Sequence, residues 1–224
     1  MSAINDYKSL IARYTSQMDK TLIAQLPPYS QAERKVTLVN DDNIKAAITA
    51  LHQANYLGFD TESKPTFSKG QKSPGVALIQ LSTASHCYIF QTNKLTSLRA
   101  LSTILDNPNI KKIGVGLRDD LTKLRTLHQF QPAGCIDLGT LFKRFGRKNS
   151  IGSKQIVALV LNKKLRKSKR VTTSNWAASE LSPHQIEYAA DDAFSSLDAF
   201  MTLRENFAAY LDQLDPSVVV LLDL

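Results

Sequence analysis

Strand-like and helix-like patterns alternate along most of this chain, and this alternation limits the possible folds more than any other feature of the sequence. Six short runs of β-branched and apolar residues are expected to be strands: Lys35–Val39, Tyr56–Glu62, Val76–Thr83, Cys87–Gln91, Lys111–Gly116 and Cys135–Leu138. Three segments between them have helical patterns: Asp41–Ala54, Leu95–Leu105 and Leu117–His128. The third and fourth strands have no helix between them, which predicts a hairpin. The pattern therefore predicts a three-layer α/β domain, with a mixed sheet of five or six strands and helices on both faces.

The two ends of the chain have patterns of their own. Residues 4–24 carry apolar side chains at spacings of three and four, the period of an amphipathic helix, and Pro27 and Pro28 then end it. The C-terminal end holds the apolar run Val218–Leu222. We expect an N-terminal helical arm over residues 1–30, a main domain over 31–210 and a C-terminal tail over 211–224. Either end segment can contact another subunit or fold back on the main domain, so the oligomeric state stays open.

Composition and charge exclude several classes of protein and favour a polyanionic partner. The chain has 224 residues with 28 Lys and Arg against 20 Asp and Glu, a net charge of +8, and nucleic acid is the natural candidate for such a basic domain. No apolar run approaches the roughly 18 residues that cross a bilayer, so we expect no membrane span. Cys87 and Cys135 lie in short apolar or β-branched segments, which predicts thiols in a reducing compartment and no zinc site. Without a continuous apolar stretch at the N-terminus, we expect an intracellular, cytoplasmic protein.

Two carboxylates end the expected strand Tyr56–Glu62. Side chains alternate along a strand, so Asp60 and Glu62 share one face with Gly58. Like charges held this close repel each other and resist burial, which favours a cation between them. A pair of acidic residues two apart is also common on protein surfaces, so surface decoration is the alternative.

A second acidic motif follows a pair of glycines in the stretch GVGLRDD, residues 114–120. A strand breaks at the glycines and turns into a helix, whose first turn contains Asp119 and Asp120. Carboxylates are favoured there by the helix dipole, so helix initiation is the alternative to a functional site.

A third motif lies on a helix that Ser182 and Pro183 are expected to start, with serine as the N-cap and proline in the first turn. Tyr188 and Asp192 are four residues apart and therefore lie on one helix face, whereas Asp191 points elsewhere. A tyrosine and an aspartate on a solvated face are the alternative interpretation.

Together, FDTE, GVGLRDDLTKL and YAADDA, in this order, resemble the DEDD exonuclease superfamily of the ribonuclease H-like fold. Because Tyr188 lies four residues before Asp192, the third motif resembles that of the branch that contains ribonuclease D and the exonuclease domain of Werner-type proteins. The resemblance covers roughly residues 35–207 and selects Asp120 over Asp119, although each aspartate doublet leaves Asp119 or Asp191 as an alternative. It implies a metal-dependent 3′-5′ exonuclease that hydrolyses phosphodiester bonds of DNA or RNA and releases nucleoside monophosphates. A non-catalytic nucleic-acid-binding or adaptor module on the same fold is the second hypothesis.

The resemblance also assigns roles to individual residues. It implies that Asp60, Glu62, Asp120, Tyr188 and Asp192 form the catalytic set. The four carboxylates would hold two divalent cations, Mg²⁺ or Mn²⁺, which suit hard oxygen ligands and can activate a water and stabilise the leaving oxygen. Asp60 would contact both ions, Glu62 and Asp192 the ion that activates water, and Asp120 the other. Tyr188, with an ordinary pKa of about 10, would orient the water while staying neutral.

Basic residues gather in the loop Lys163–Thr173, just before the third motif, where the chain is otherwise helical. We expect this loop to follow a phosphate backbone, although a solvated loop is an equal alternative. The polar loop 63–75 is expected to line the same cleft, with Phe67 available to stack on a base. The residues expected to bind nucleic acid are Lys69, Lys72, Lys163, Lys164, Arg166, Lys167, Lys169 and Arg170.

Overall fold

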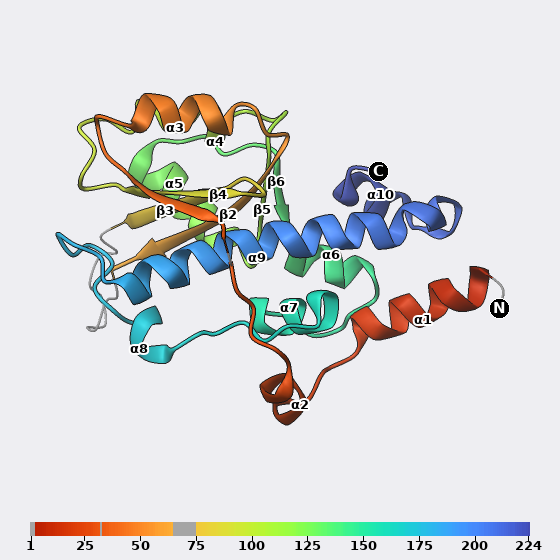
Figure 1. Cartoon of the computed structure of the whole chain (residues 1–224). Helices are drawn as coiled ribbons and strands as arrows, with labels where there is room; N and C mark the ends of the chain where they lie inside the picture. The colour runs from red at the N-terminus through yellow and green to blue at the C-terminus, as the bar shows by residue number, and fades with distance from the viewer. Residues whose placement is uncertain (1–2, 32, 65–74) are drawn as a thin grey trace.

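A six-stranded mixed sheet forms the centre of the molecule (Figure 1). The computed structural model describes residues 3–31, 33–64 and 75–224. Its strands are β1 (Lys35–Val39), β2 (Tyr56–Ser63), β3 (Val76–Ser82), β4 (His86–Gln91), β5 (Lys111–Gly114) and β6 (Cys135–Asp137). They are arranged in the order β1-β4-β3-β2-β5-β6, in which β3 runs antiparallel to both neighbours and the other pairs are parallel. The expected hairpin and mixed sheet are confirmed.

Helices cover both faces of this sheet, as expected (Figure 1). One face carries α3 (Ile44–Leu51), α4 (Arg99–Leu105) and α5 (Arg118–His128), whose apolar side chains pack with Leu57 and Phe59 of β2. The helices α3 and α4 begin later than expected. Asn40 forms a turn in front of α3, because its side-chain oxygen accepts the backbone N–H groups of Asp42 and Asn43 at 3.1 Å.

The opposite face is covered mainly by α9, which runs along the molecule from Pro183 to Phe207 (Figure 1). The expected start is confirmed: Ser182 and Gln185 form a reciprocal capping box. Around α9 lie α6 (Leu138–Arg144), α7 (Ser153–Leu161), α8 (Lys169–Thr172), the 3₁₀ helix η1 (Ala208–Gln213) and α10 (Pro216–Leu222). None of the helices in the described part of the chain is long and apolar enough to cross a membrane.

The close approach of β2 and α9 depends on Gly58. A Cβ atom at this position would lie 1.9 Å from the carbonyl oxygen of Ala193, closer than non-bonded atoms can come. Ala189, Ala190 and Ala193 are fully buried and keep this part of α9 narrow. The small residues therefore let the acidic end of β2 face α9 directly.

The N-terminal segment forms two helices where the sequence predicts one over residues 4–24. The structure has α1 (Ala3–Thr15) and α2 (Lys20–Gln25), and Asp19 caps α2 by accepting the N–H of Thr21 at 2.7 Å. Tyr14 of α1 is fully buried in the same apolar cluster as residues of α6, α9 and α10. The expected division of the chain at residues 30 and 210 stays a prediction.

Candidate metal centre

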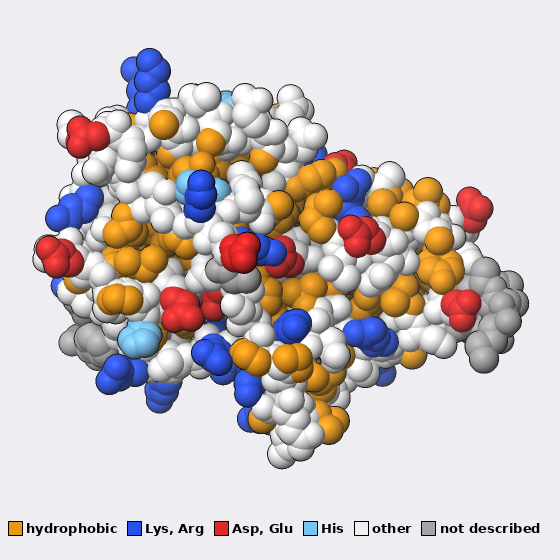
Figure 2. Space-filling view, viewed as in Figure 1, with side chains coloured by type: hydrophobic (Ala, Val, Ile, Leu, Met, Phe, Trp, Pro, Cys, Tyr) orange, Lys and Arg blue, Asp and Glu red, His pale blue; other side chains and the backbone are white. Residues whose placement is uncertain are grey.

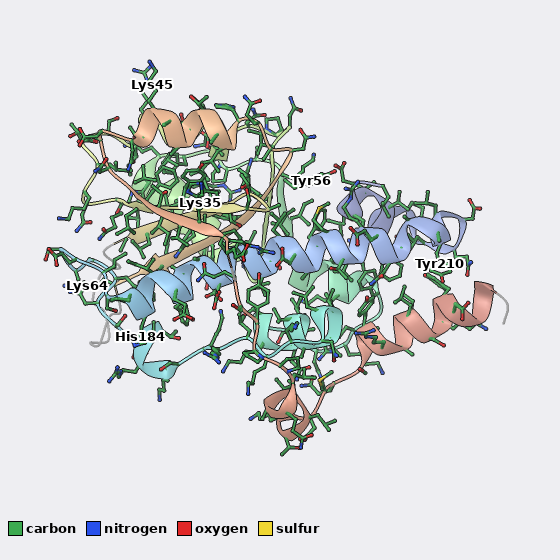
Figure 3. The ribbon with its side chains drawn as sticks, viewed as in Figure 1. Lys35, Lys45, Tyr56, Lys64, His184 and Tyr210 are labelled. Atoms are coloured by element: carbon green, nitrogen blue, oxygen red, sulfur yellow. The ribbon has the colours of Figure 1, made fainter. Side chains whose placement is uncertain are left out.

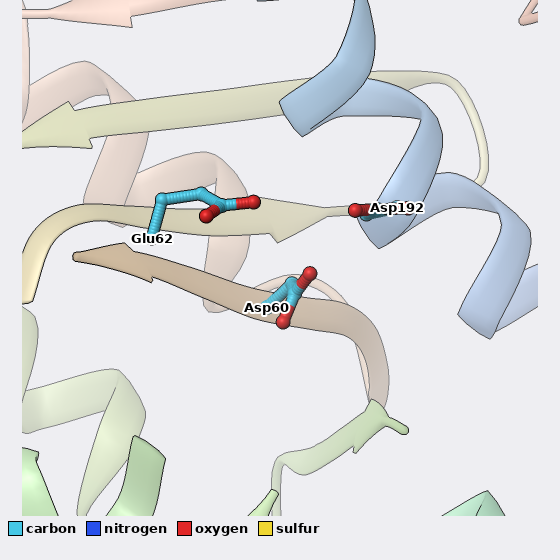
Figure 4. A group of neighbouring side chains, drawn as sticks. All are labelled: Asp60, Glu62 and Asp192. Atoms are coloured by element: carbon cyan, nitrogen blue, oxygen red, sulfur yellow. The ribbon is translucent and has the colours of Figure 1, made fainter. Parts of the chain in front are cut away.

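Three carboxylates converge between β2 and α9. Asp60 and Glu62 stand on the face of β2 that α9 covers, and Asp192 approaches them from α9 (Figure 4). Each offers one oxygen atom, and the three atoms lie within 4.8 Å of one another. Asp60 and Glu62 are half-buried, whereas Asp192 is only 4% exposed. We call these three residues the acidic cluster.

Burial and mutual repulsion keep protons on the acidic cluster. Burial, followed by the charge of Asp60, raises the pKa of Glu62 to about 9. Burial and then the charge of Asp192 raise the pKa of Asp60 well above its usual range. Burial also raises the pKa of Asp192, while the neighbouring Lys167 opposes this change. Binding of a cation would therefore release protons from the cluster.

A lysine from the loop in front of α8 reaches into the acidic cluster. The Nζ atom of Lys167 lies 2.9 Å from Oδ2 of Asp192 and 5.4 Å from the centre of the Tyr188 ring. Burial by itself lowers the pKa of Lys167, but the carboxylates of Asp192 and Asp60 outweigh it and raise the pKa. The sequence predicts Lys167 as a phosphate contact on an open loop, whereas the structure pairs its ammonium with a carboxylate.

The donor set of the cluster fits a divalent cation. Carboxylate oxygens are the hard ligands that Mg²⁺ and Mn²⁺ prefer. When these three carboxylates and Asp120 are ionised, the Lys167 ammonium compensates one of the four negative charges, and three remain to attract divalent cations. Burial is the main cause of the raised pKa values of Asp60 and Glu62, and the excess of negative charge adds to it.

Asp120 lies beside the cluster but outside the group of three. It belongs to the first turn of α5, and its Oδ1 accepts a hydrogen bond of 2.7 Å from the hydroxyl of Thr61. Thr61 stands between Asp60 and Glu62 in β2, so its side chain points to the opposite face of the strand. The charge of Asp120 contributes to the raised pKa of Asp60, which places the two carboxylates in electrostatic contact. The neighbouring Asp119 is exposed.

Asp137, at the end of β6, fixes the turn that leads into α5. Its carboxylate accepts the backbone N–H groups of Gly116 at 3.1 Å and Leu117 at 2.9 Å. Gly116 has a φ angle of 73°, in the left-handed region where glycine is favoured. These contacts set the start of α5 and hence the position of Asp120.

Tyr188 lies one helical turn before Asp192, as the spacing predicts. Its hydroxyl is 3.0 Å from the Thr172 hydroxyl of α8, and its ring packs against the fully buried Trp176 with 5.7 Å between the ring centres. The indole N–H of Trp176 donates to the Thr172 carbonyl at 3.2 Å. Burial, followed by the charge of Asp192, raises the pKa of Tyr188 to about 12, so the phenol is neutral at neutral pH.

Four of the basic residues that the sequence predicts to bind nucleic acid line two cavities. Lys164, Arg166 and Lys167 line a cavity of about 650 Å³ between α2, α7 and the loop before α8. Arg166 and Arg170 line a second cavity of about 290 Å³, whose wall includes Tyr188. Figure 2 shows Lys and Arg side chains gathered along the lower edge of the molecule, from α8 to α2.

The other predicted basic residues lie elsewhere. Lys163 and Lys169 are exposed and line neither of these two cavities. Lys69 and Lys72 lie outside the described residues, as does Phe67. Contact of any of these side chains with nucleic acid stays a prediction.

Several residues that contact the site residues were not assigned these contacts from the sequence. The role of Thr61 follows from the alternation of side chains, because a residue between two carboxylates must point to the other face of the strand. Lys167 carried no local signal, since its neighbours in the sequence are also basic and only the path of the loop brings one of them to Asp192. The contact of Thr172 with Tyr188 and that of Asp137 with the turn before α5 also depend on how distant elements pack together.

Comparison with known proteins gives a consistent family assignment. A family model described as 3′-5′ exonuclease matches residues 36–208. The bifunctional 3′-5′ exonuclease/ATP-dependent helicase WRN of Mus musculus is 31% identical over 156 residues, which are 68% of this chain and 11% of that protein. The crystal structure of the Aedes aegypti Nibbler EXO domain has a TM-score of 0.70 and 25% identity, and covers 93% of this chain and 99% of that one.

The same fold occurs in Escherichia coli RNase D, which is described as an exoribonuclease involved in structured RNA processing. Its structure has a TM-score of 0.70 and 26% identity, over 84% of this chain and 48% of that one. The architecture is therefore the ribonuclease H-like α/β fold of these exonuclease domains. The chain spans between 11% and 53% of the length of the first curated relatives that it matches.

Proposed function

The chain belongs to the 3′-5′ exonuclease family, and from this premise we propose that it is an active, metal-dependent 3′-5′ exonuclease of the tyrosine-bearing DEDD branch. Its reaction would be hydrolysis of the terminal phosphodiester bond of DNA or RNA, with release of a nucleoside monophosphate. The observation that carries the proposal is the convergence of Asp60, Glu62 and Asp192 from β2 and α9. All three lie inside the region that the family model matches.

We assign the acidic cluster, together with Asp120, to the binding of two divalent cations, Mg²⁺ or Mn²⁺. Such ions, when bound, polarise the phosphate and lower the pKa of a water molecule. The protein's part is to hold the carboxylates ready: Gly58 lets β2 approach α9, and Thr61 fixes Asp120 beside Asp60. Oxygen ligands that are already placed lose little freedom when the cations arrive.

Tyr188 and Lys167 complete the proposed centre. The neutral phenol of Tyr188, oriented by Thr172, is suited to hold the attacking water by a hydrogen bond while keeping its own proton. The ammonium of Lys167 opposes the rise in the pKa of Asp192 that burial causes, and so favours its ionised form. This ammonium also lies where it can attract the phosphate that is cleaved.

The relatives leave the choice of nucleic acid open. RNase D is described as acting on RNA, whereas WRN is described as combining an exonuclease with a helicase. The net charge of +8 suits either polyanion. We keep an intracellular location as a prediction, which agrees with the two free cysteines Cys87 and Cys135.

The proposal is tested by digestion of 5′-labelled single-stranded DNA and RNA of one sequence and of a recessed duplex. Each is incubated with Mg²⁺ or Mn²⁺, with chelator, and with an Asp60→Ala variant. We expect a ladder that shortens from the 3′ end, that is lost with chelator and that is absent with the variant. Folded protein that cleaves no substrate, including a series of short oligonucleotides, would contradict the proposal and favour a binding module.

A further inference from the structure

The N-terminal segment forms one wall of the largest of the cavities described above. We call residues 16–30, which include α2, the strap, and residues 162–168 the basic loop. The cavity of about 650 Å³ is lined by four residues of the strap, two of α7 and four of the basic loop. Figure 1 shows α2 and α7 facing each other across this part of the molecule. The residues from the strap lie outside the region that the family model matches.

Among the described residues, every charged side chain that lines this cavity is basic. Five of its ten lining residues are Lys or Arg and none is Asp or Glu. Lys154 and Lys164 donate to backbone carbonyls, which leaves the charge of each ammonium uncompensated. Lys20 of the strap is exposed, and among the described residues neither it nor Arg166 has a carboxylate within ion-pair distance. Lys167 is paired with Asp192, and the charges of Lys20 and Arg166 act on Asp19 and Asp191 beyond ion-pair distance. An anion in the cavity would thus meet a lining in which cations are in excess.

Hydrogen bonds hold the strap against the domain, so the strap forms a fixed wall of the cavity. Arg147, only 6% exposed, donates to the backbone oxygens of Thr15 and Ser16. The Gln155 side chain pairs with both backbone groups of Met18, at 3.2 and 2.7 Å. Such contacts with buried or half-buried partners fix one end of the strap on the domain.

The far end of the strap is joined to the basic loop itself. The backbone N–H of Lys164 donates to the carbonyl of Pro27 at 2.8 Å, and the N–H of Tyr29 donates to the carbonyl of Lys164 at 2.9 Å. The Lys164 ammonium also binds the carbonyl of Ala24 at 2.8 Å. Strap and basic loop are therefore one unit around the cavity.

The cavity adjoins the proposed metal centre at the basic loop, where Lys167 lines both. Lys167 lines the cavity and pairs with Asp192 of the acidic cluster. Arg166 lines both this cavity and the one that reaches Tyr188. The remaining lining includes the apolar side chains of Ile23, Ala24 and Leu165, so the space has both cationic and apolar walls.

We propose that this cavity binds the nucleotides that precede the 3′-terminal one in a single-stranded substrate. Phosphates would contact Lys20 and Arg166, and bases would pack on the aliphatic side chains of Ile23 and Leu165 without sequence preference. The strap is then part of the substrate site. This inference rests on the proposed exonuclease function and adds to it a site for the upstream strand.

The main test compares Lys20→Glu with Lys45→Glu. Lys45 stands on α3, on the opposite side of the molecule from α2 (Figure 3), and gives the same change of charge. We expect Lys20→Glu to raise the KM for a single-stranded decanucleotide about tenfold, the value of one charge-assisted contact. The rise for a dinucleotide should be smaller. Binding of the decanucleotide in EDTA should lose about 0.7 from its log-log salt slope, and Lys45→Glu should change neither quantity.

A second pair of variants tests whether the open volume of the cavity is needed for binding, without a change of charge. Ala24→Trp fills the cavity from the strap, and Ala46→Trp places the same side chain on an exposed position of α3. Ala24→Trp should weaken decanucleotide binding, and Ala46→Trp should not. Thermal unfolding of all four variants checks that each is folded.

The possible results separate this inference from the proposed function. If wild type cleaves the decanucleotide and neither Lys20→Glu nor Ala24→Trp differs from its control, the cavity assignment is wrong and the exonuclease proposal stands. If wild type binds without cleavage, the exonuclease proposal fails and the binding comparison alone decides the cavity. If the wild type neither binds nor cleaves the decanucleotide, the exonuclease proposal and the cavity assignment are both wrong. If a nucleoside monophosphate competes for the cavity in wild type but not in Lys20→Glu, the product and not the upstream strand is its ligand.

Discussion

The two sides of the proposed active site are built in different ways. The acidic side consists of one strand and one helix, β2 and α9, whose side-chain directions follow from their periodicity. The basic side consists of the basic loop and the strap, whose positions depend on hydrogen bonds between residues more than a hundred positions apart. Regular secondary structure thus positions the carboxylates, while tertiary hydrogen bonds position the lysine and arginine side chains. Four predictions test this contrast.

The largest effect is expected on the acidic side, for Asp192→Asn. Loss of a metal ligand removes several kcal/mol of stabilisation of the transition state, which corresponds to a rate loss of about 10³-fold or more. Asp191→Asn is the matched control, because Asp191 is a buried neighbour on the same helix outside the group of three carboxylates. The cleavage rate of Asp192→Asn should be at least about 100-fold lower than that of Asp191→Asn. Equal losses would mean that the helix face was assigned wrongly.

On the basic side, Lys167→Met should lower the stability of the metal-free protein. Breaking a buried ion pair costs about 3–5 kcal/mol, and we expect the lower end because the Lys167 side chain keeps 23% exposure. Urea unfolding in EDTA measures the loss, and added Mg²⁺ should recover much of it. A stability equal to that of wild type would show that the contact with Asp192 contributes nothing.

Gly58→Ala tests whether the two regular elements must touch. The added methyl would lie 1.9 Å from the Ala193 carbonyl, and such overpacking costs about 1–3 kcal/mol in a core. Gly152→Ala is the control, since a Cβ there meets nothing within 4 Å. Chemical unfolding should show a loss for Gly58→Ala alone, and metal affinity should fall with it. Unchanged metal affinity would mean that the spacing of β2 and α9 is not critical.

The smallest expected effect is on the pH dependence of stability. The pKa of Glu62 is about 9 in the folded chain against an ordinary value of 4.5, so the folded state binds more protons in this interval. Its contribution to stability is present below about pH 4.5 and is lost as the pH rises towards 9. The increase in melting temperature caused by Mg²⁺ should therefore grow over this range, and Glu62→Gln should reduce that growth. A Mg²⁺ effect that is independent of pH would contradict the assignment.

The difference between the two sides also explains what could be predicted from the sequence. Alternation in β2 placed Asp60 and Glu62 on one face of the strand, and the four-residue spacing in α9 placed Tyr188 and Asp192 on one face of the helix. The resemblance to the exonuclease superfamily, and not the periodicity, implied that these faces meet, and the structure brings Asp60, Glu62 and Asp192 together. The mixed sheet and the start of α9 at Ser182 followed from equally local signals. The side-chain directions within each element needed only the geometry of regular secondary structure.

What the sequence did not show depends on contacts between distant segments. The break between α1 and α2, the docking of Tyr14 and the pairing of Lys167 with Asp192 each need a partner far along the chain. The hydrogen bond that holds Asp120 to Thr61 beside the other carboxylates is likewise a contact between distant segments, and the role of Asp120 as a metal ligand stays a prediction. A run of basic residues shows that a loop is charged, but not which side chain turns inward.

The most direct test of the central claim is anomalous diffraction from crystals grown with Mn²⁺. We expect manganese density bounded by Asp60, Glu62 and Asp192, with the Lys167 ammonium displaced from Asp192 or shared with the metal's oxygen ligands. Manganese density elsewhere, with these three carboxylates still protonated or paired only with Lys167, would show that they are not the metal centre.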